Sequence, residues 1–257
     1  IQDSNDPYAD EIIARVYDDA NALIEGANVV PERMIMQLLF PINGAAGISI
    51  KANGVDYTYN YDPDQSWKTN NYTALTTTDL WTAPTTADPL KAIKKVKDTI
   101  RSKTGTEIVH AIMNTNTFNL LAATDAIKNR YLTVNGRALS YLTDAEVKAV
   151  ISGTVGVDLV IYDKMYRDED KAAKAFVPDG YVCFIPEGII GGTWYGTTPE
   201  EADLQGSGKA DVSIVNTGVA ITRIVEEHPV NINTFASEIV LPSFERMDEV
   251  AVMKVIA

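Results

Sequence analysis

The chain has 257 residues, 46% of them hydrophobic and 22% charged, with a formal net charge of −13. This composition is typical of a folded globular protein and excludes disordered, collagen-like and disulfide-rich classes. A single cysteine, Cys183, excludes a disulfide framework and a thiolate metal cage. The acidic balance argues against general affinity for nucleic acids, because phosphate binding needs a surplus of Lys and Arg. No apolar run reaches the roughly 18 residues of a membrane span.

Residues 7–40 carry apolar side chains at spacings of three and four, which predicts one long helix. Gly26 and Pro31 weaken or kink this helix, because proline removes a ladder hydrogen bond and crowds the preceding turn. If the helix is continuous, it spans about 50 Å at ~1.5 Å per residue. The stripe consists of Ile12, Ile13, Val16, Tyr17, Ala20, Leu23 and Ile24, followed by Met34, Ile35, Leu38 and Leu39.

A hairpin is predicted over ISIKANGVDYTYNYD (48–62), with Asn53-Gly54 at the turn. Its second strand places Val55, Tyr57, Tyr59 and Tyr61 alternately on one face. The polar stretch 63–87 that follows is expected to be a loop anchored by two tryptophans, Trp67 and Trp81.

The rest of the chain mixes helices with largely antiparallel strands, which favours an α+β fold over a doubly wound sheet. Thr143 and Glu146 have the capping-box spacing, which predicts a helix start. Helices are expected at 88–104, 115–123 and 143–152, with strands at 107–113, 157–163, 173–177 and 181–187. The tail holds strands at 221–227, 230–240 and 249–257, the last two enclosing the loop LPSFERMD (241–248).

The sequence contains no recognisable catalytic motif. Its two histidines and one cysteine form neither an HExxH motif, a CxxC pair nor a GxSxG elbow. His110 is expected to be a core or half-buried residue of a strand, and the neighbours of Cys183 predict a buried structural thiol. Adjacent Glu226 and Glu227 point to opposite faces of a strand, so they cannot flank one scissile bond. We therefore predict no catalytic residue, no cofactor and no metal ligand.

Charge is distributed unevenly between two predicted helices. Residues 1–30 hold seven acids against Arg15 alone, whereas the helix at 88–104 holds six Lys and Arg against two Asp. One interpretation is that both are solvated faces. In the other, the acidic helix of one copy faces the basic helix of a neighbouring copy, with Lys94 and Lys95 as contact residues.

Six segments, taken in order, carry a resemblance: PERMIMQLLF (31–40), the hairpin 48–62, WTAPTTADPLKAIKKVKDTI (81–100), EIVHAIMNTNTFNLLAA (107–123), FVPDGYVCFIPEG (176–188) and the tail 225–255. Together they resemble the lambda capsid-protein-E family of tailed-bacteriophage major capsid proteins, which adopts the Hong Kong 97 fold. The resemblance implies a long spine helix, a peripheral domain (1–87 and 223–257) and an axial α/β domain (88–222).

The resemblance also implies what the protein does. It implies a non-enzymatic shell protein that assembles as hexamers and pentamers around double-stranded DNA, in the bacterial cytoplasm and then in the virion. Scaffold, portal and decoration proteins are the implied partners, without a membrane or a cofactor. Subunits would meet at the tail loop, through Ser243, Phe244, Glu245, Arg246 and Asp248.

The sequence departs from the family at one point. Family members carry an N-terminal arm and a long hairpin, the E-loop, upstream of the spine helix, and neither precedes Ile1. We therefore expect a truncated or processed species that builds shells inefficiently by itself.

Two alternatives stay open. The first is an encapsulin-like nanocompartment shell protein, which cargo-peptide binding would distinguish from a phage protein. The second is a carbohydrate-binding or adhesive module that uses Trp67, Trp81 and Trp194 as a stacking platform.

Overall fold

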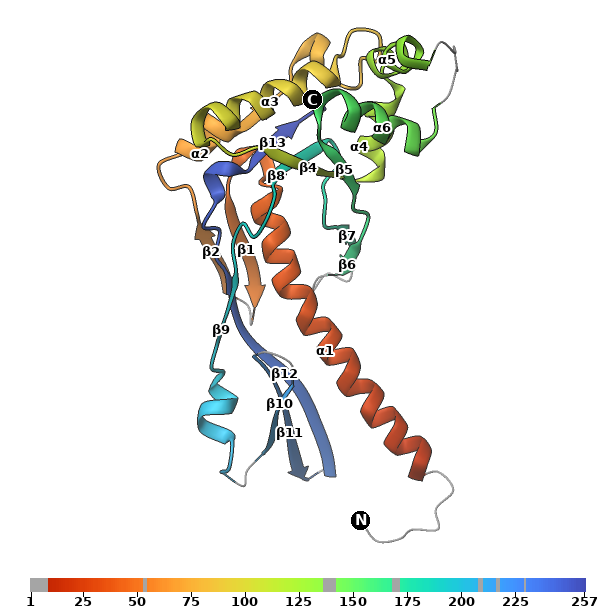
Figure 1. The fold of residues 1–257 in the computed structure, drawn as a ribbon. Helices are drawn as coiled ribbons and strands as arrows, with labels where there is room; N and C mark the ends of the chain where they lie inside the picture. The colour runs from red at the N-terminus through yellow and green to blue at the C-terminus, as the bar shows by residue number, and fades with distance from the viewer. Residues whose placement is uncertain are drawn as a thin grey trace. The chain divides into compact units, whose positions relative to one another are not determined.

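The structure is a computed structural model that describes residues 9–52, 55–135, 142–167, 172–207, 210–215, 218–228 and 230–257. Its contacts divide the chain into two compact units, which are treated separately below. The first unit contains residues 1–33 and 193–243, and the second contains 34–192 and 244–257. The predicted α+β class is confirmed, because helices are interspersed with mainly antiparallel strands (Figure 1). The assignment of peripheral and axial roles stays a prediction.

The long helix predicted at the start is present as α1, Ala9–Leu39. It continues through Gly26 and Pro31, so its 31 residues extend for about 46 Å at ~1.5 Å per residue. Its last turns are buried in the second unit, where Met34, Leu38 and Leu39 are at most 7% exposed. The first two residues of the predicted helix, 7 and 8, lie outside the described residues.

The second unit is built on a five-stranded sheet with the order β3-β13-β8-β4-β5. Its strands are Tyr72–Ala74 (β3), Ala251–Lys254 (β13), Tyr181–Pro186 (β8), Ile108–Met113 (β4) and Asp158–Ile161 (β5). The two outer pairings, β13 with β3 and β4 with β5, are parallel, and the two inner ones are antiparallel.

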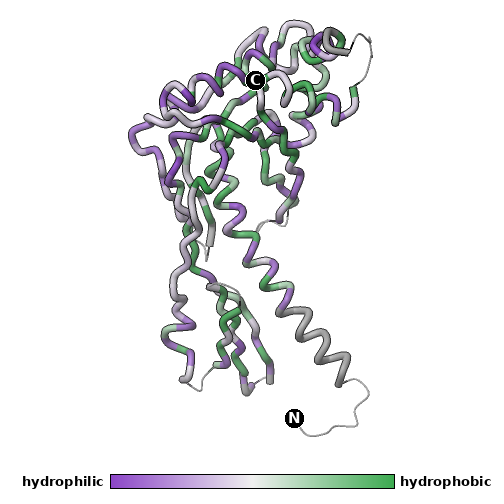
Figure 2. Tube along the Cα trace, viewed as in Figure 1, coloured by the Kyte–Doolittle hydropathy of each residue, from purple (hydrophilic) through white to green (hydrophobic). Residues whose placement is uncertain are grey.

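The central strand β8 joins two hydrophobic cores. Val182 and Phe184 pack into one core, while Tyr181 and Cys183 pack into the other, as the alternation of a strand requires. The larger core lies against the helices that follow β3, and the smaller contains the end of α1 and Trp67. Figure 2 shows the hydrophobic colour concentrated along these strands and more polar colour on the helices.

The helices of the second unit are α2 (Ser66–Asn71), α3 (Pro89–Thr104), α4 (Thr115–Ala123), α5 (Asp125–Asn135) and α6 (Asp144–Val155). Asp88 caps α3 by accepting the Lys91 N–H, and the predicted capping box of Thr143 and Glu146 opens α6. Sequence analysis missed α5, whose side chains form only a weakly amphipathic pattern.

The segment 63–87, predicted as a loop, contains α2, β3 and the short helix η2 (Thr77–Asp79). Both predicted anchors are buried: Trp67 and Trp81 are 2% and 1% exposed. The indole N–H of Trp67 donates to the carbonyls of Met247 (3.0 Å) and Val250 (3.2 Å). The amide of Asn71 donates to the Val250 carbonyl as well, at 2.8 Å. These bonds fasten α2 to the returning tail, next to the short helix η4 (Met247–Glu249).

Two hairpins complete the second unit. The predicted first hairpin is formed by β1 (Gly47–Ala52) and β2 (Val55–Asn60), and its expected turn residues, Asn53 and Gly54, lie outside the described residues. It follows a short helix, η1 (Ile42–Gly44). The other hairpin pairs β6 (Met165–Arg167) with β7 (Ala173–Ala175).

The first unit contains α1 up to Arg33 and an antiparallel sheet with the order β10-β11-β12-β9. Its strands are Thr193–Gly196 (β9), Asp211–Val215 (β10), Val219–Glu227 (β11) and Val230–Pro242 (β12), with the π-helix η3 (Glu200–Leu204) after β9. The predicted tail ribbon is therefore present as β11 and β12. The last predicted strand instead joins the other sheet, as β13.

Replacing Ile93 by Ala is expected to lower the free energy of unfolding by about 2–5 kcal/mol, because the fully buried side chain leaves a cavity in the larger core. Urea unfolding measures this change. The neighbouring exposed substitution Lys94→Ala should alter the same free energy by less than about 0.5 kcal/mol. Equal effects of both substitutions would contradict the inward placement of Ile93.

Candidate functional site

Helix α3 carries an exposed basic face. Lys91 lies about one turn before the adjacent Lys94 and Lys95 on its surface, and none of the three forms an ion pair within the described part of the chain. Because positions i, i+3 and i+4 of a helix share one side, the three ammonium groups make one positive patch. We call these three residues the lysine patch.

The other basic residues of α3 are used inside the unit. The ammonium of Lys97 donates to the carbonyls of Val155 (3.2 Å) and Gly156 (3.1 Å), at the carboxyl end of α6. Arg101 pairs with Glu107 at 3.0 Å, and Lys103 donates to the Asn70 carbonyl at 2.9 Å. Sequence alone could not separate these structural cations from the three that remain exposed.

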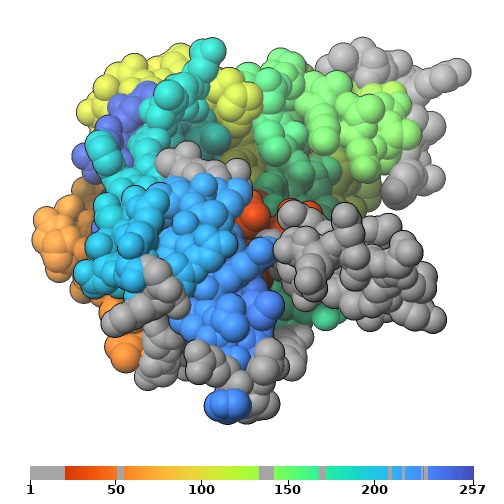
Figure 3. Space-filling view, turned by 90° about the horizontal axis from the view of Figure 1, so that it is seen from below, coloured from red at the N-terminus to blue at the C-terminus, as the bar shows by residue number. Residues whose placement is uncertain are grey.

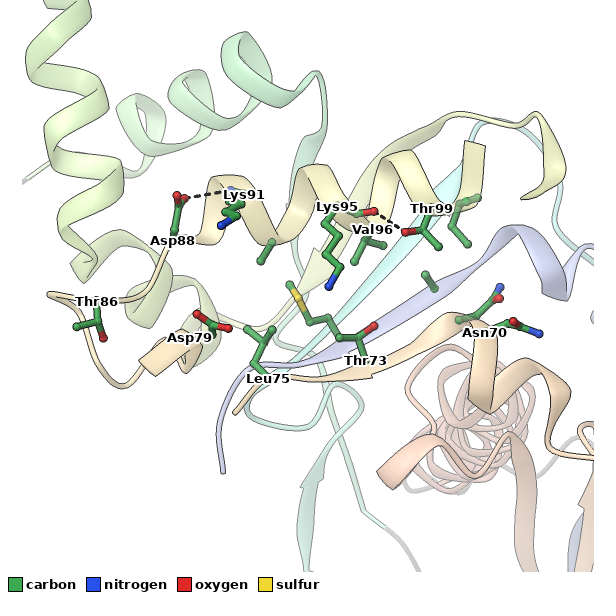
Figure 4. Close-up of a pocket in the computed structure, with 15 residues that line it drawn as sticks. Asn70, Thr73, Leu75, Asp79, Thr86, Asp88, Lys91, Lys95, Val96 and Thr99 are labelled. Carbon is green, nitrogen blue, oxygen red and sulfur yellow. Dashed lines mark hydrogen bonds between the residues drawn. The ribbon is translucent and has the colours of Figure 1, made fainter. Parts of the chain in front are cut away.

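A groove of about 490 Å³ runs beside the lysine patch, between α3 and the strands β3 and β13. Its floor is apolar and includes Val96, Ile100 and Met253. Figure 4 shows Lys95 extending from α3 into the groove, with Thr73 and Leu75 on the opposite side. The groove thus combines an apolar floor with a mixed rim, in which Lys91 and Lys95 lie among Asp79, Asp88 and uncharged polar side chains.

The predicted contact loop at 241–248 is tied down from within. The backbone N–H of Arg246 donates to the Ile190 carbonyl (3.0 Å), and its guanidinium donates to the carbonyls of Glu187 (3.1 Å) and Ile189 (3.2 Å). The guanidinium Nε also donates to Glu249, at 3.1 Å. The donors of Arg246 therefore hold the 187–190 turn against η4.

The remaining predicted residues of this loop face different ways. Phe244 packs, half-buried, against the smaller core, and Ser243 is half-buried. Glu245 and Asp248 are exposed, although the Asp248 carbonyl accepts the amide N–H of Asn71 at 2.7 Å. The contact of this loop with neighbouring subunits stays a prediction, and exposed Glu245 and Asp248 are its best placed members.

Sequence analysis singled out Trp194 but missed the other exposed apolar residues on the sheet of the first unit. Val225 and Ile232 face each other across β11 and β12 and are 64% and 62% exposed. Trp194 and Leu241 form a second such pair, at 68% and 39% exposed. These residues appear in the sequence as apolar positions among polar ones. Such a pattern predicts a strand, but it does not tell which of its two faces is buried. Figure 3 shows β11 and β12 in blue on the surface.

The tryptophans do not form a stacking platform. Trp67 and Trp81 are buried anchors, and Trp194 is the exposed one of the three. A glycan-stacking surface needs several accessible rings, so the carbohydrate-binding alternative loses the residues on which it was based.

The residues that could have served in catalysis or metal binding, Cys183 and His110, both belong to the central sheet of the second unit. Cys183 is fully buried, as predicted, and burial raises the pKa of its thiol. His110 is half-buried on β4, opposite Asp158 of β5 and Ile185 of β8. Among the described residues, no three His, Cys, Asp or Glu side chains gather as metal ligands would. None of the described helices has the length and apolarity needed to cross a membrane.

Removing the Arg246 guanidinium is expected to destabilise the protein. The hydrogen bond from Arg246 lowers the pKa of Glu249, so this carboxylate stabilises the fold above its unfolded pKa and loses that effect as pH falls through the folded pKa. Arg246→Ala should therefore lower the free energy of unfolding at neutral pH, and the difference from wild type should shrink in acid. Asp248→Ala is the control, and urea unfolding at several pH values is the measurement. A pH-independent difference would contradict the role of Glu249.

Comparisons with known proteins identify the fold and the family. The sequence profile described as phage major capsid protein E matches residues 8–255. Among solved structures, the chain is similar to a protein assigned as a prophage capsid protein from Escherichia coli CFT073, with a TM-score of 0.67 and 15% identity over 100% of this chain and 72% of that one. A phage-related protein from Bordetella bronchiseptica RB50 has a TM-score of 0.53 and 13% identity, over 91% and 65% of the two chains.

A weaker similarity, with a TM-score of 0.41 and 12% identity over 91% and 64% of the two chains, relates the chain to the SrpI encapsulin from Synechococcus elongatus PCC 7942. No curated protein matches the sequence. The profile match over nearly the whole length confirms the resemblance predicted from the sequence: the chain belongs to the phage major capsid protein E family and is a phage capsid protein.

Proposed function

We propose that this capsid protein forms the wall of an icosahedral shell by associating with copies of itself as hexamers and pentamers. The exposed apolar pairs of the first unit carry this proposal, above all Val225 with Ile232. Water-exposed cross-strand apolar pairs add little to the stability of one chain but become favourable when another surface covers them. A shell subunit is covered in this way on several sides.

The lysine patch supplies a second, polar contact. We propose that it receives the acidic segment 1–30 of another copy, the arrangement that the charge pattern of the sequence suggested. Lys94 and Lys95 are both exposed and form no ion pair within the described residues, so both are available to a partner. Complementary charges fix the orientation of an interface more than they add affinity.

The shell would enclose double-stranded DNA without reading its sequence. The net charge of −13 supports this role, since an acidic wall does not hold the phosphate backbone. The proposal also includes a purely structural, non-enzymatic role, scaffold, portal and decoration proteins as partners, and assembly in the bacterial cytoplasm before residence in the virion. We retain the peripheral domain (1–87 and 223–257) and the axial domain (88–222) as part of it.

The double substitution Val225→Ser with Ile232→Ser is expected to weaken self-association while leaving the unfolding transition nearly unchanged, because both side chains are mostly exposed. Sedimentation velocity over a concentration series, with electron microscopy of the largest species, measures assembly. Asn231→Ser, on the other face of β12, is the matched control. Unchanged assembly of the double variant would remove the supporting observation.

Charge reversal at Lys94 and Lys95 (K94E with K95E) should weaken self-association several-fold in low salt, and less in high salt because ions screen the contact. The control is K128E with K148E, on α5 and α6, which changes the net charge equally. If both double variants sediment alike, the loss reflects net charge alone and the lysine patch has no specific role.

A further inference from the structure

The hairpin of β1 and β2 has one covered edge and one open edge. On the β1 side, the Gln37 amide of α1 makes two hydrogen bonds with the backbone of Ser49. Its Nε2 donates to the Ser49 carbonyl at 3.1 Å, and the Ser49 N–H donates to its Oε1 at 2.9 Å. A primary amide bound in this way takes the place of a neighbouring strand. The β1 edge is therefore covered by the chain itself at Ser49.

The open edge belongs to β2, and the register of the hairpin shows which backbone groups it presents. Tyr57 pairs with Ile50 and Tyr59 with Ile48, and the Tyr61 N–H donates to the Ala46 carbonyl at 3.0 Å. Because antiparallel strands alternate, the odd-numbered residues of β2 bond inward to β1. The N–H and C=O groups of Asp56, Thr58 and Asn60 consequently point outward.

Among the described residues, β2 pairs with β1 alone. All six of its residues are exposed, including Val55 (50%), Tyr57 (46%) and Tyr59 (44%). The strand contains no proline and no lysine, and its pairing with β1 runs without a bulge. A two-stranded hairpin is marginally stable in water, whereas three or more strands hold together. An open, aromatic edge strand in a self-assembling protein is thus a site for one more strand.

We propose that β2 pairs antiparallel with β2 of a second copy about a two-fold axis at Thr58. This inference rests on the proposed self-assembly and names one of its contacts. The product is a four-stranded sheet in which each copy contributes β1 and β2. Both copies use the same surface, as a two-fold contact requires, and an icosahedral shell contains such axes.

Self-complementarity of β2 selects this register. Centring on Thr58 places Asp56 opposite Asn60 of the second copy, so a carboxylate meets an amide, and all three outward-pointing residues form hydrogen-bonded pairs. Tyr57 then lies opposite the second copy's Tyr59 at the closer, non-hydrogen-bonded spacing, where aromatic pairs stabilise a sheet. Centring on Asp56 would set two carboxylates face to face. Centring on Tyr57 would leave Asn60 without a strand partner.

A cysteine scan of the full chain tests the pairing and its register together. Hydrogen-bonded antiparallel partners have Cα atoms about 5.5 Å apart, within the roughly 4.4–6.8 Å range of disulfides. Oxidised Thr58→Cys should therefore migrate as a disulfide-linked dimer on non-reducing gels. Asp56→Cys and Asn60→Cys should each remain monomeric alone, because four residues along a strand separate identical positions by about 14 Å. Mixed together, these two variants should cross-link. The native Cys183 is fully buried and does not interfere.

Each other outcome overturns a defined part of the proposal. If wild-type protein self-associates in sedimentation but Thr58→Cys does not cross-link, the strand pairing is wrong and the proposed shell function is unaffected. Equal cross-linking of Thr58→Cys and Asp56→Cys would show random collisions and refute the pairing. Cross-linking of Thr58→Cys with Asp56→Cys in a mixture would move the axis to Tyr57. A wild-type chain that stays monomeric without cross-links counts against the proposed self-assembly as well.

Discussion

The insertion of β13 between β3 and β8 is the constraint on which the second unit depends. Along the described chain, β3 is paired with β13 alone, so the edge of the sheet and one wall of the α3 groove exist because the tail returns there. Trp67 and Asn71 secure this return through hydrogen bonds to the Val250 carbonyl. A buried carbonyl without a donor would destabilise the folded state. This explains why a tryptophan and an asparagine occupy α2.

Local signals in the sequence predicted the elements whose ends are marked by side chains. Asp88 and Gly105 bound α3, and the capping box of Thr143 opens α6, because these residues satisfy backbone groups within a few positions of themselves. The strand β3 was missed, since its three residues gain their conformation only from β13, which lies far along the chain. The candidate site shows the same limit: Lys97 and Lys94 look alike in sequence, yet only Lys97 reaches the carbonyls at the end of α6.

The candidate contacts occur in both units and differ in chemistry. The first unit offers exposed apolar pairs on a sheet, while the second offers the lysine patch and an aromatic hairpin. Each surface is small, so each contact alone would be weak. Several weak contacts made together become strong through effective concentration, which suits a subunit that must join a closed assembly and still correct misplaced additions.

The amide of Gln37 leaves the hairpin with a single open edge, that of β2. A sheet with two open edges can add strands from further chains without limit, and this is how fibres grow. Here Gln37 of α1 covers the β1 edge at Ser49, so the proposed sheet of two hairpins would carry a Gln37 amide at each outer side. In the proposed pairing, neither outer edge would then offer the Ser49 backbone to a further strand. The Gln37 side chain would thereby favour a sheet of two hairpins over a longer one.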